Sequence, residues 1–192
     1  MMRKIERENT GLLQAGQDLV VAGYAGLAGT VKLAEAAKEE LSRWFSDEYM
    51  EEIADAAPLC PVSPEFWRSC GAAEWEPAGE GGILTAIWNL TGAYETGVKF
   101  YLRQIPMRQE TVEVCERLGV NPYRLYSRGC VLLTADNGGQ LVRILAEKHI
   151  PAQVIGRVNK GIAREMIVQE GRGFLERPQP DEITKVIPGF FK

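Results

Sequence analysis

Apolar residues occur along the chain in short runs and in helical stripes, separated by turns rich in glycine and proline. The apolar run at 18–22 leads into a glycine-rich turn at 23–30, which predicts a strand that ends in a turn. Alanine, leucine and tryptophan then recur on one helical face, so a helix is expected over about 30–45. A serine-aspartate pair is expected to cap a second helix over 46–56.

The middle of the chain begins with a cluster of prolines. Pro64 suits the first turn of a short helix that reaches about Cys70. The stretch 75–82 is glycine-rich, and we expect it to be irregular. An apolar stripe after Gly82 predicts a helix. The second half predicts, in chain order, a strand at 98–102, a helix at 107–118, a buried strand at 129–135, a helix after Asn137, and strands at 154–158 and 163–169 that pair as a hairpin.

This order of elements favours an α+β fold, in which helices cover a mixed β-sheet. The pattern divides the chain into an N-terminal extension at 1–17, one domain at 18–177 and a tail at 178–192. A length of 192 residues fits one such domain.

The charge balance argues against a nucleic-acid-binding protein. The 22 basic and 26 acidic residues give a net charge of −4, and no basic cluster stands out. The charged start has no apolar run behind it, and no apolar stretch is long enough to span a bilayer. We therefore expect a cytoplasmic protein with no membrane partner.

The four cysteines are Cys60, Cys70, Cys115 and Cys130, and none has CxxC spacing. With His149 as the single histidine, we expect reduced thiols and no metal site. Cys130 lies in an apolar strand and is typical of a small core residue. The pattern leaves open whether Cys115 and Cys130 are accessible.

The strongest local signal is the turn Glu80-Gly81-Gly82 in front of a helix. Glycines there let backbone N–H groups approach a ligand, and the helix dipole favours an anion. The same glycines also suit a tight connection that needs positive φ or close packing. Glu80 is the candidate catalytic residue, as a general base, and is equally a candidate helix cap.

A second glycine segment contains Gly26, Gly29 and Thr30, and it follows the same logic of glycines, a hydroxyl and a helix. It lacks the lysine and the length of a P-loop, so it indicates either a weak ligand site or a packed turn.

Taken in order, five segments resemble the C-terminal domain of the AIR synthase family, and are most similar to its hydrogenase expression/formation factor-like branch. The segments are DLVVAGYAGLAGT at 18–30, EGGILTAIWNL at 80–90, IPMRQETVEVC at 105–115, NPYRLYSRGCVLL at 121–133 and IPAQVIGRV at 150–158.

The resemblance implies a three-layer α+β domain in which Glu80, Gly81 and Gly82 face the family's substrate cleft. Family members also carry an N-terminal domain whose acidic motifs hold magnesium and ATP. Only 17 residues precede Asp18, so we expect that half to be absent, with ATP and magnesium as cofactors only if a partner supplies it. Of the family's His-Asp-x-Thr-Glu-Gly-Gly pattern only the last three residues remain, and the hydrogenase factor's C-terminal cysteine is replaced by the ending Pro-Gly-Phe-Phe-Lys.

The first hypothesis is a ligand-binding or accessory module that binds a small anionic ligand or docks with a separate ATP-binding chain. Without the N-terminal half an apolar patch should be exposed, which favours a homo-oligomer or a partner chain. The alternative is half of a split ATP-dependent maturation or kinase-like enzyme that a partner chain completes. A purely structural domain is the third hypothesis, in which Glu80→Ala affects helix capping alone.

Overall fold

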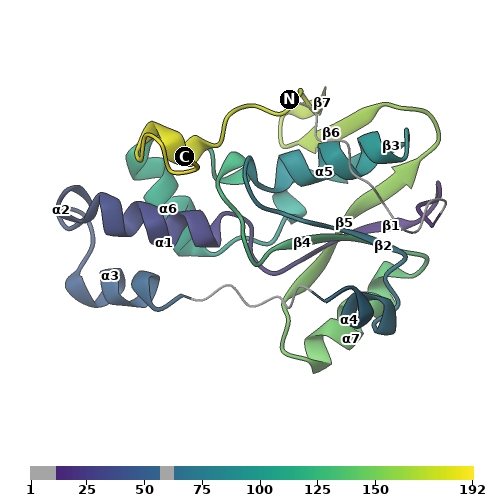
Figure 1. Cartoon of the computed structure of the whole chain (residues 1–192), viewed down its shortest axis with the longest axis horizontal. Coiled ribbons are helices and arrows are strands. Elements are labelled where there is room, and N and C mark those ends of the chain that lie inside the picture. Colours follow the sequence, from purple (N-terminus) through teal and green to yellow (C-terminus); the bar gives the residue numbers. More distant parts are fainter. Residues whose placement is uncertain (1–11, 57–62) are drawn as a thin grey trace.

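The computed structural model describes residues 12–56 and 63–192. Their centre is a seven-stranded mixed sheet with the order β2-β4-β1-β5-β3-β6-β7 (Figure 1). Neighbouring strands are antiparallel except β3 and β6, which run parallel. The strands are β1 Asp18–Ala22, β2 Glu74–Pro77, β3 Gly97–Tyr101, β4 Val131–Ala135, β5 Ala152–Asn159, β6 Arg164–Val168 and β7 Gly171–Phe174.

Helices cover both faces of the sheet, and this confirms the α+β fold. Figure 1 shows α5 on one face, α4 and α7 on the other, and the remaining helices gathered at one end. The helices are α1 Leu27–Ala36, α2 Lys38–Leu41, α3 Asp47–Ala54, α4 Pro64–Ser69, α5 Gly82–Ala93, α6 Gln109–Leu118 and α7 Gly138–Glu147, with the 3₁₀ turns η1 Leu102–Gln104, η2 Pro122–Arg124 and η3 Glu182–Lys185.

The alternation of side chains along β1 creates this layering. Successive side chains of a strand point to opposite faces of the sheet. Leu19 and Val21 belong to the apolar cluster that contains α5, whereas Val20 and Ala22 belong to the cluster with α4 and α7. All four side chains have no exposed surface, so β1 is apolar at successive positions because both of its faces are covered.

The first helix differs from its predicted span of 30–45. It begins at Leu27, because Gly26 already takes the left-handed conformation at the N-cap (φ 74°), and it is interrupted at Ala37. The predicted cap of the following helix is confirmed, because the Ser46 hydroxyl accepts the Tyr49 N–H at 3.2 Å.

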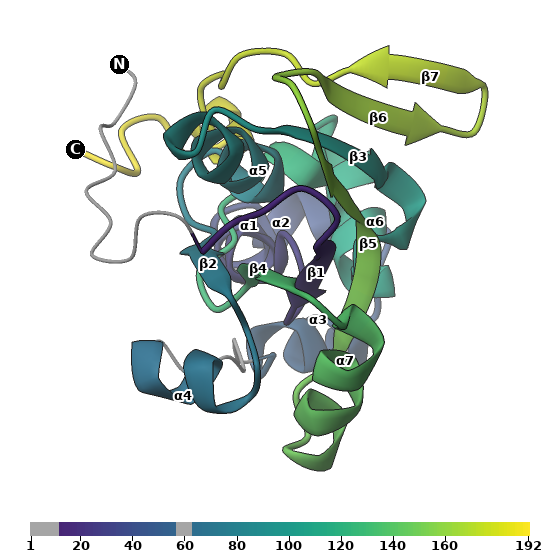
Figure 2. The same cartoon turned by 90° about the vertical axis from the view of Figure 1, so that its right-hand side faces the viewer.

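Two local predictions were wrong. The segment predicted as irregular contains the edge strand β2, whose Trp75 pairs with Leu133 of β4. The predicted hairpin of β5 and β6 does not form, because β3 lies between them and pairs with both. Instead β6 forms a hairpin with β7, and this hairpin is one edge of the sheet (Figure 2).

The C-terminal segment packs onto the helical end of the molecule. Ile183 has no exposed surface and belongs to the apolar cluster of α1, α3 and α6, next to Leu33 and Leu125. Figure 1 shows the segment crossing from the β6–β7 side toward these helices. Across residues 12–56 and 63–192, no helix has the length and apolarity that crossing a membrane requires.

Candidate functional site

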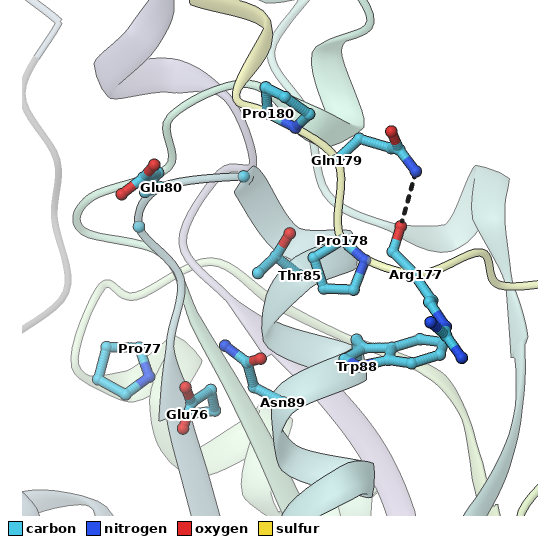
Figure 3. Close-up of a pocket in the computed structure, with 12 residues that line it drawn as sticks. Glu76, Pro77, Glu80, Thr85, Trp88, Asn89, Arg177, Pro178, Gln179 and Pro180 are labelled. Carbon is cyan, nitrogen blue, oxygen red and sulfur yellow. Dashed lines mark hydrogen bonds between the residues drawn. The ribbon is translucent and has the colours of Figure 1, made fainter. Parts of the chain in front are cut away.

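A cavity of about 800 Å³ lies beside the glycine turn that precedes α5 (Figure 3). One wall is the end of β2 with the turn after it, the second is the stretch of α5 from Thr85 to Asn89, and the third is the segment 177–180. The lining residues are Glu76, Pro77, Gly79, Glu80, Gly81, Thr85, Trp88, Asn89, Arg177, Pro178, Gln179 and Pro180. Three segments that are distant in sequence therefore form one pocket.

The glycine turn is shaped by close packing as well as by its backbone angles. Gly81 is the N-cap of α5 in the left-handed conformation (φ 78°), and Gly82 follows with φ 67°. A Cβ atom on Gly82 would lie 2.5 Å from the Tyr123 carbonyl oxygen and 2.8 Å from that of Leu125. Gly82 therefore seats α5 against the backbone of the segment 122–127.

The Asp181 carboxylate occupies the N-terminus of α5. Its Oδ2 accepts the Gly81 N–H at 2.6 Å, and its Oδ1 accepts the N–H groups of Tyr126 at 3.1 Å and Ile183 at 2.9 Å. The side chain is 2% exposed, and this burial raises the pKa of Asp181, with the nearby Glu80 as a minor further cause. An anion thus already lies where the sequence predicts one, but it belongs to the chain itself.

Sequence reasoning missed Asp181, which lies 100 residues from Gly81 in a proline-containing segment with few apolar residues. The one available signal was local. Asp181 is the N-cap residue of the short helical turn η3, and its side chain accepts the Ile183 N–H.

Glu80 lies at the exposed edge of the cavity, and Figure 3 shows its carboxylate on the loop before α5. Within the part of the chain that the structure describes, no hydrogen bond holds this carboxylate, and Gly81 is the N-cap. The side chain is available to a ligand.

The α5 wall offers both polar and apolar groups. Within residues 12–56 and 63–192, the Thr85 hydroxyl is buried and has no hydrogen-bond partner. Trp88 is half-buried, and its ring is held by the Arg164 guanidinium, which lies 4.1 Å from the ring centroid. Arg164 in turn donates to the Thr91 hydroxyl at 2.6 Å. This wall therefore has one fixed aromatic side chain and a buried hydroxyl without a partner.

The segment 177–180 supplies the third wall. All four residues are exposed, and the Gln179 side-chain amide donates to the Arg177 carbonyl at 3.3 Å (Figure 3). Arg177 is the cationic member of the lining.

The second predicted glycine segment does not line the cavity. The Gly26 N–H donates to the Ser127 hydroxyl at 2.8 Å, and the Thr30 hydroxyl donates to the Gly26 carbonyl at 2.9 Å. A Cβ atom on Gly29 would lie 2.5 Å from Leu125 Cγ. Gly26 and Gly29 pack on the segment 122–127, as Gly82 does, so the structure brings both glycine segments onto one backbone stretch. Of the predicted site residues, Glu80 and Gly81 line the cavity.

The three cysteines that the structure describes do not line the cavity. Cys70, Cys115 and Cys130 are buried thiols outside its lining, and burial raises the pKa of Cys115 to about 12. Cys60 lies outside the described residues. Among the residues that the structure describes, no group of three or more histidine, cysteine or acidic side chains is placed to hold a metal ion.

Curated relatives match most of this chain. A protein of Methanocaldococcus jannaschii named as a hydrogenase expression/formation protein is 24% identical over 182 residues, which cover 91% of this chain and 52% of that protein. Subunit PurL of phosphoribosylformylglycinamidine synthase from Corynebacterium glutamicum is 23% identical over 162 residues, which cover 81% of this chain and 20% of the subunit. The chain thus spans about half the length of the first relative and a fifth of the second.

Solved structures with the same fold include hydrogenase maturation proteins and a kinase. E. coli HypE superposes with a TM-score of 0.71 at 19% identity, covering 91% of this chain and 53% of HypE. Thiamine-monophosphate kinase from Stenotrophomonas maltophilia gives a TM-score of 0.61 at 17% identity, covering 80% of this chain and 50% of the kinase. HypE is also present among the similar structures in complex with ATP and in a HypE–HypF complex.

The family model described as AIR synthase related protein, C-terminal domain, matches residues 14–169. The match begins before β1 and ends within the β6–β7 turn, so it includes the glycine turn and α5. The chain therefore belongs to the AIR synthase related proteins, with that family's C-terminal domain as its body.

Proposed function

We propose that this domain is a ligand-binding accessory module related to hydrogenase maturation factors, and that its cavity binds a small anionic or nucleotide-like ligand. The observation that carries the proposal is the cavity of about 800 Å³ beside α5 and the glycine turn before it. Cavities of this size take small organic ligands. The HypE structure in complex with ATP supports a nucleotide-like ligand.

The lining chemistry supports a ligand with both an anionic and a hydrogen-bonding part. Arg177 offers a cation and the Asn89 amide a neutral donor, and the buried Thr85 hydroxyl becomes a second donor if the wall opens. Glu80 offers an acceptor for a hydroxyl or amino group on the same ligand. Trp88 adds an apolar wall, which a sugar or a heterocyclic base covers well.

As a second candidate, we infer half of an ATP-dependent maturation or kinase-like reaction, completed by an ATP-binding half. This inference is supported by the first relative's greater length and by the HypE–HypF complex among the similar structures. Glu80 would then serve as the general base. Magnesium-dependent ATP turnover is expected only when an ATP-binding chain is added, whereas ligand binding alone needs no second chain.

A thermal-shift series tests the binding function on the purified chain, with ATP, ADP, AMP, carbamoyl phosphate or buffer, each with and without magnesium. A ligand at ~100-fold over its dissociation constant adds about 2.7 kcal/mol, or about 5–10 °C in a chain of this size. We expect Arg177→Gln to reduce the shift to about half, because a tenfold weaker affinity removes about 1.4 kcal/mol of it.

The matched control is Arg43→Gln, which removes an exposed guanidinium outside the cavity and should keep the full shift. Equal shifts in both variants would place the ligand elsewhere. If none of the ligands shifts the melting temperature of the wild type or of the Asp181→Asn variant, the binding function is wrong and a purely structural domain remains.

A further inference from the structure

We propose that Asp181 is an internal anion that competes with the ligand, so that the anionic group of a bound ligand displaces it and moves the segment 177–182. The inference rests on the proposed function and assigns a regulation to the same site. The segment would act as a gate that is closed in this structure. The ligand class it selects carries a phosphate or carboxylate group able to take the position of the Asp181 carboxylate.

The geometry at the α5 N-terminus carries the first step. The Gly81 N–H points to Asp181 Oδ2 at 2.6 Å, and the Gly82 N–H donates to the Gly79 carbonyl at 3.1 Å. The free N–H groups at a helix N-terminus are the natural site for an anion. An external anion can reach the Gly81 N–H only if the Asp181 carboxylate leaves it.

A buried polar group next to Gly81 points to a ligand. Within the described residues, the buried Thr85 hydroxyl has no hydrogen-bond partner and lines the cavity. It lies 2.3 Å from the place where a Cβ atom on Gly81 would stand, and therefore at the N-terminus of α5. A buried hydroxyl without a partner is costly in a folded protein, and a ligand oxygen at this position would satisfy it.

The segment is built so that it can move without loss of the fold. Residues 177–180 are exposed and form the outer wall of the cavity, as Figure 3 shows. Ile183 anchors the following turn because it is fully buried in the cluster with α1 and α6. Opening therefore breaks the contacts of Asp181 and the hydrogen bond from the Asn121 N–H to Glu182 Oε2 at 2.9 Å, and leaves the apolar anchor in place.

Removal of Asp181 has different effects on stability and on anion binding, depending on whether Asp181 only caps α5 or also competes with a ligand. If Asp181 only caps α5, its removal destabilises the chain and does not improve anion binding. If Asp181 competes, the chain binds an anion only in its open state, and the apparent affinity is reduced by the fraction that is open. For an open state populated at up to about 10%, removal of the competitor strengthens binding about tenfold or more.

Isothermal titration with inorganic phosphate compares the wild type with Asp181→Asn. Asparagine keeps the shape of the side chain and one acceptor oxygen, but its amide N–H₂ cannot accept the Gly81 N–H. We expect at least about tenfold tighter phosphate binding in this variant. The matched control is Glu176→Gln, which removes one charge directly before the segment 177–182, at a side chain that is 76% exposed and pairs with Arg124 rather than with the Asp181 contacts. It should bind phosphate as the wild type does.

Equal or weaker phosphate binding by Asp181→Asn, with the wild type still responding to nucleotides, would overturn the gate and leave the proposed function standing. Tightening of both variants to the same extent would also overturn it, because a general charge effect then explains the result. If neither protein responds to phosphate or to nucleotides, the proposed function fails and the gate fails with it.

Hydrogen exchange on the wild type provides a test that needs no variant. Displacement of Asp181 frees the amides of Tyr126 and Ile183, whose acceptor is Asp181 Oδ1. We expect saturating phosphate to speed exchange of these two amides while it protects Gly81. Slower exchange at all three amides would show that the carboxylate stays in place, and would contradict the proposal.

Discussion

A Gly82→Ala substitution tests whether α5 is seated on the backbone of the segment 122–127. The new Cβ atom would lie 2.5 Å from the Tyr123 carbonyl oxygen, 2.8 Å from that of Leu125 and 2.9 Å from the Arg124 carbonyl carbon. All three are backbone atoms, so they cannot avoid the contact by a change of rotamer. The helix and the segment must move apart, which opens the cavity wall at Gly81.

The expected loss has two parts that a matched control separates. Left-handed backbone costs an alanine about 1–2 kcal/mol, and overpacking a tight contact costs about 1–3 kcal/mol more. Gly119 has nearly the same backbone angle, φ 63° against 67°, but a Cβ atom there would meet no heavy atom of the described residues within 4 Å. Gly119→Ala should therefore lose the first part alone, and Gly82→Ala about 2–5 kcal/mol in total.

Urea denaturation followed by circular dichroism measures both losses by linear extrapolation. Unchanged m-values would show that the two variants unfold between comparable states. If Gly82→Ala loses no more free energy of unfolding than Gly119→Ala, the close contact of α5 with Tyr123 and Leu125 is wrong.

Three further predictions concern burial. Since Ile183 is fully buried, Ile183→Ala should lose about 2–5 kcal/mol of unfolding free energy in urea denaturation. The control Ile162→Ala, at a residue that is 72% exposed, should change it by no more than about 0.5 kcal/mol. Equal losses in the two variants would place 181–192 outside the fold. Burial raises the pKa of Cys115 to about 12, so iodoacetamide at pH 8 should label this thiol only when urea unfolds the chain. Peptide mass spectrometry detects the label. Rapid labelling of Cys115 in the native chain would contradict its burial. Burial also raises the pKa of Asp181 above its ordinary value of 3.8, so the native state binds this proton more tightly than the unfolded state. The stabilisation that comes from this protonation is therefore fully present below that value and is lost as pH rises through the native pKa. In urea denaturation, the wild type should gain free energy of unfolding relative to Asp181→Asn as pH falls from about 7 to about 4. A difference between the two proteins that does not depend on pH would refute this.

The sequence predicted the elements whose signal is local. The capping serine before α3 and the stripe of α5 are set by residues within one or two helical turns, and both are confirmed. The pairing of β6 depends instead on β3, which precedes it by more than 60 residues, and a hairpin was the natural local interpretation. The strand β2 was missed because two of its four residues are glutamates, one is a proline, and it pairs with β4 on one side only.

The candidate site shows the same division between local and distant information. Glycines before an apolar stripe identify the turn at Gly81, and this turn does line a cavity. The same signal at Gly26 marks a turn that is packed internally against Ser127. Whether a glycine turn meets solvent or another segment is decided by tertiary packing. For the same reason, Asp181 could not be paired with Gly81 from the sequence.

The binding function is tested most directly by NMR of the ¹⁵N-labelled chain titrated with AMP. We expect the resonances of the Gly81 amide and the Trp88 indole N–H to shift together and to saturate at one dissociation constant. The indole of Trp44, which is 61% exposed and lies outside the cavity, should stay unchanged. Shifts confined to residues away from α5, or no saturating shift at Gly81 and Trp88, would contradict a ligand site in this cavity.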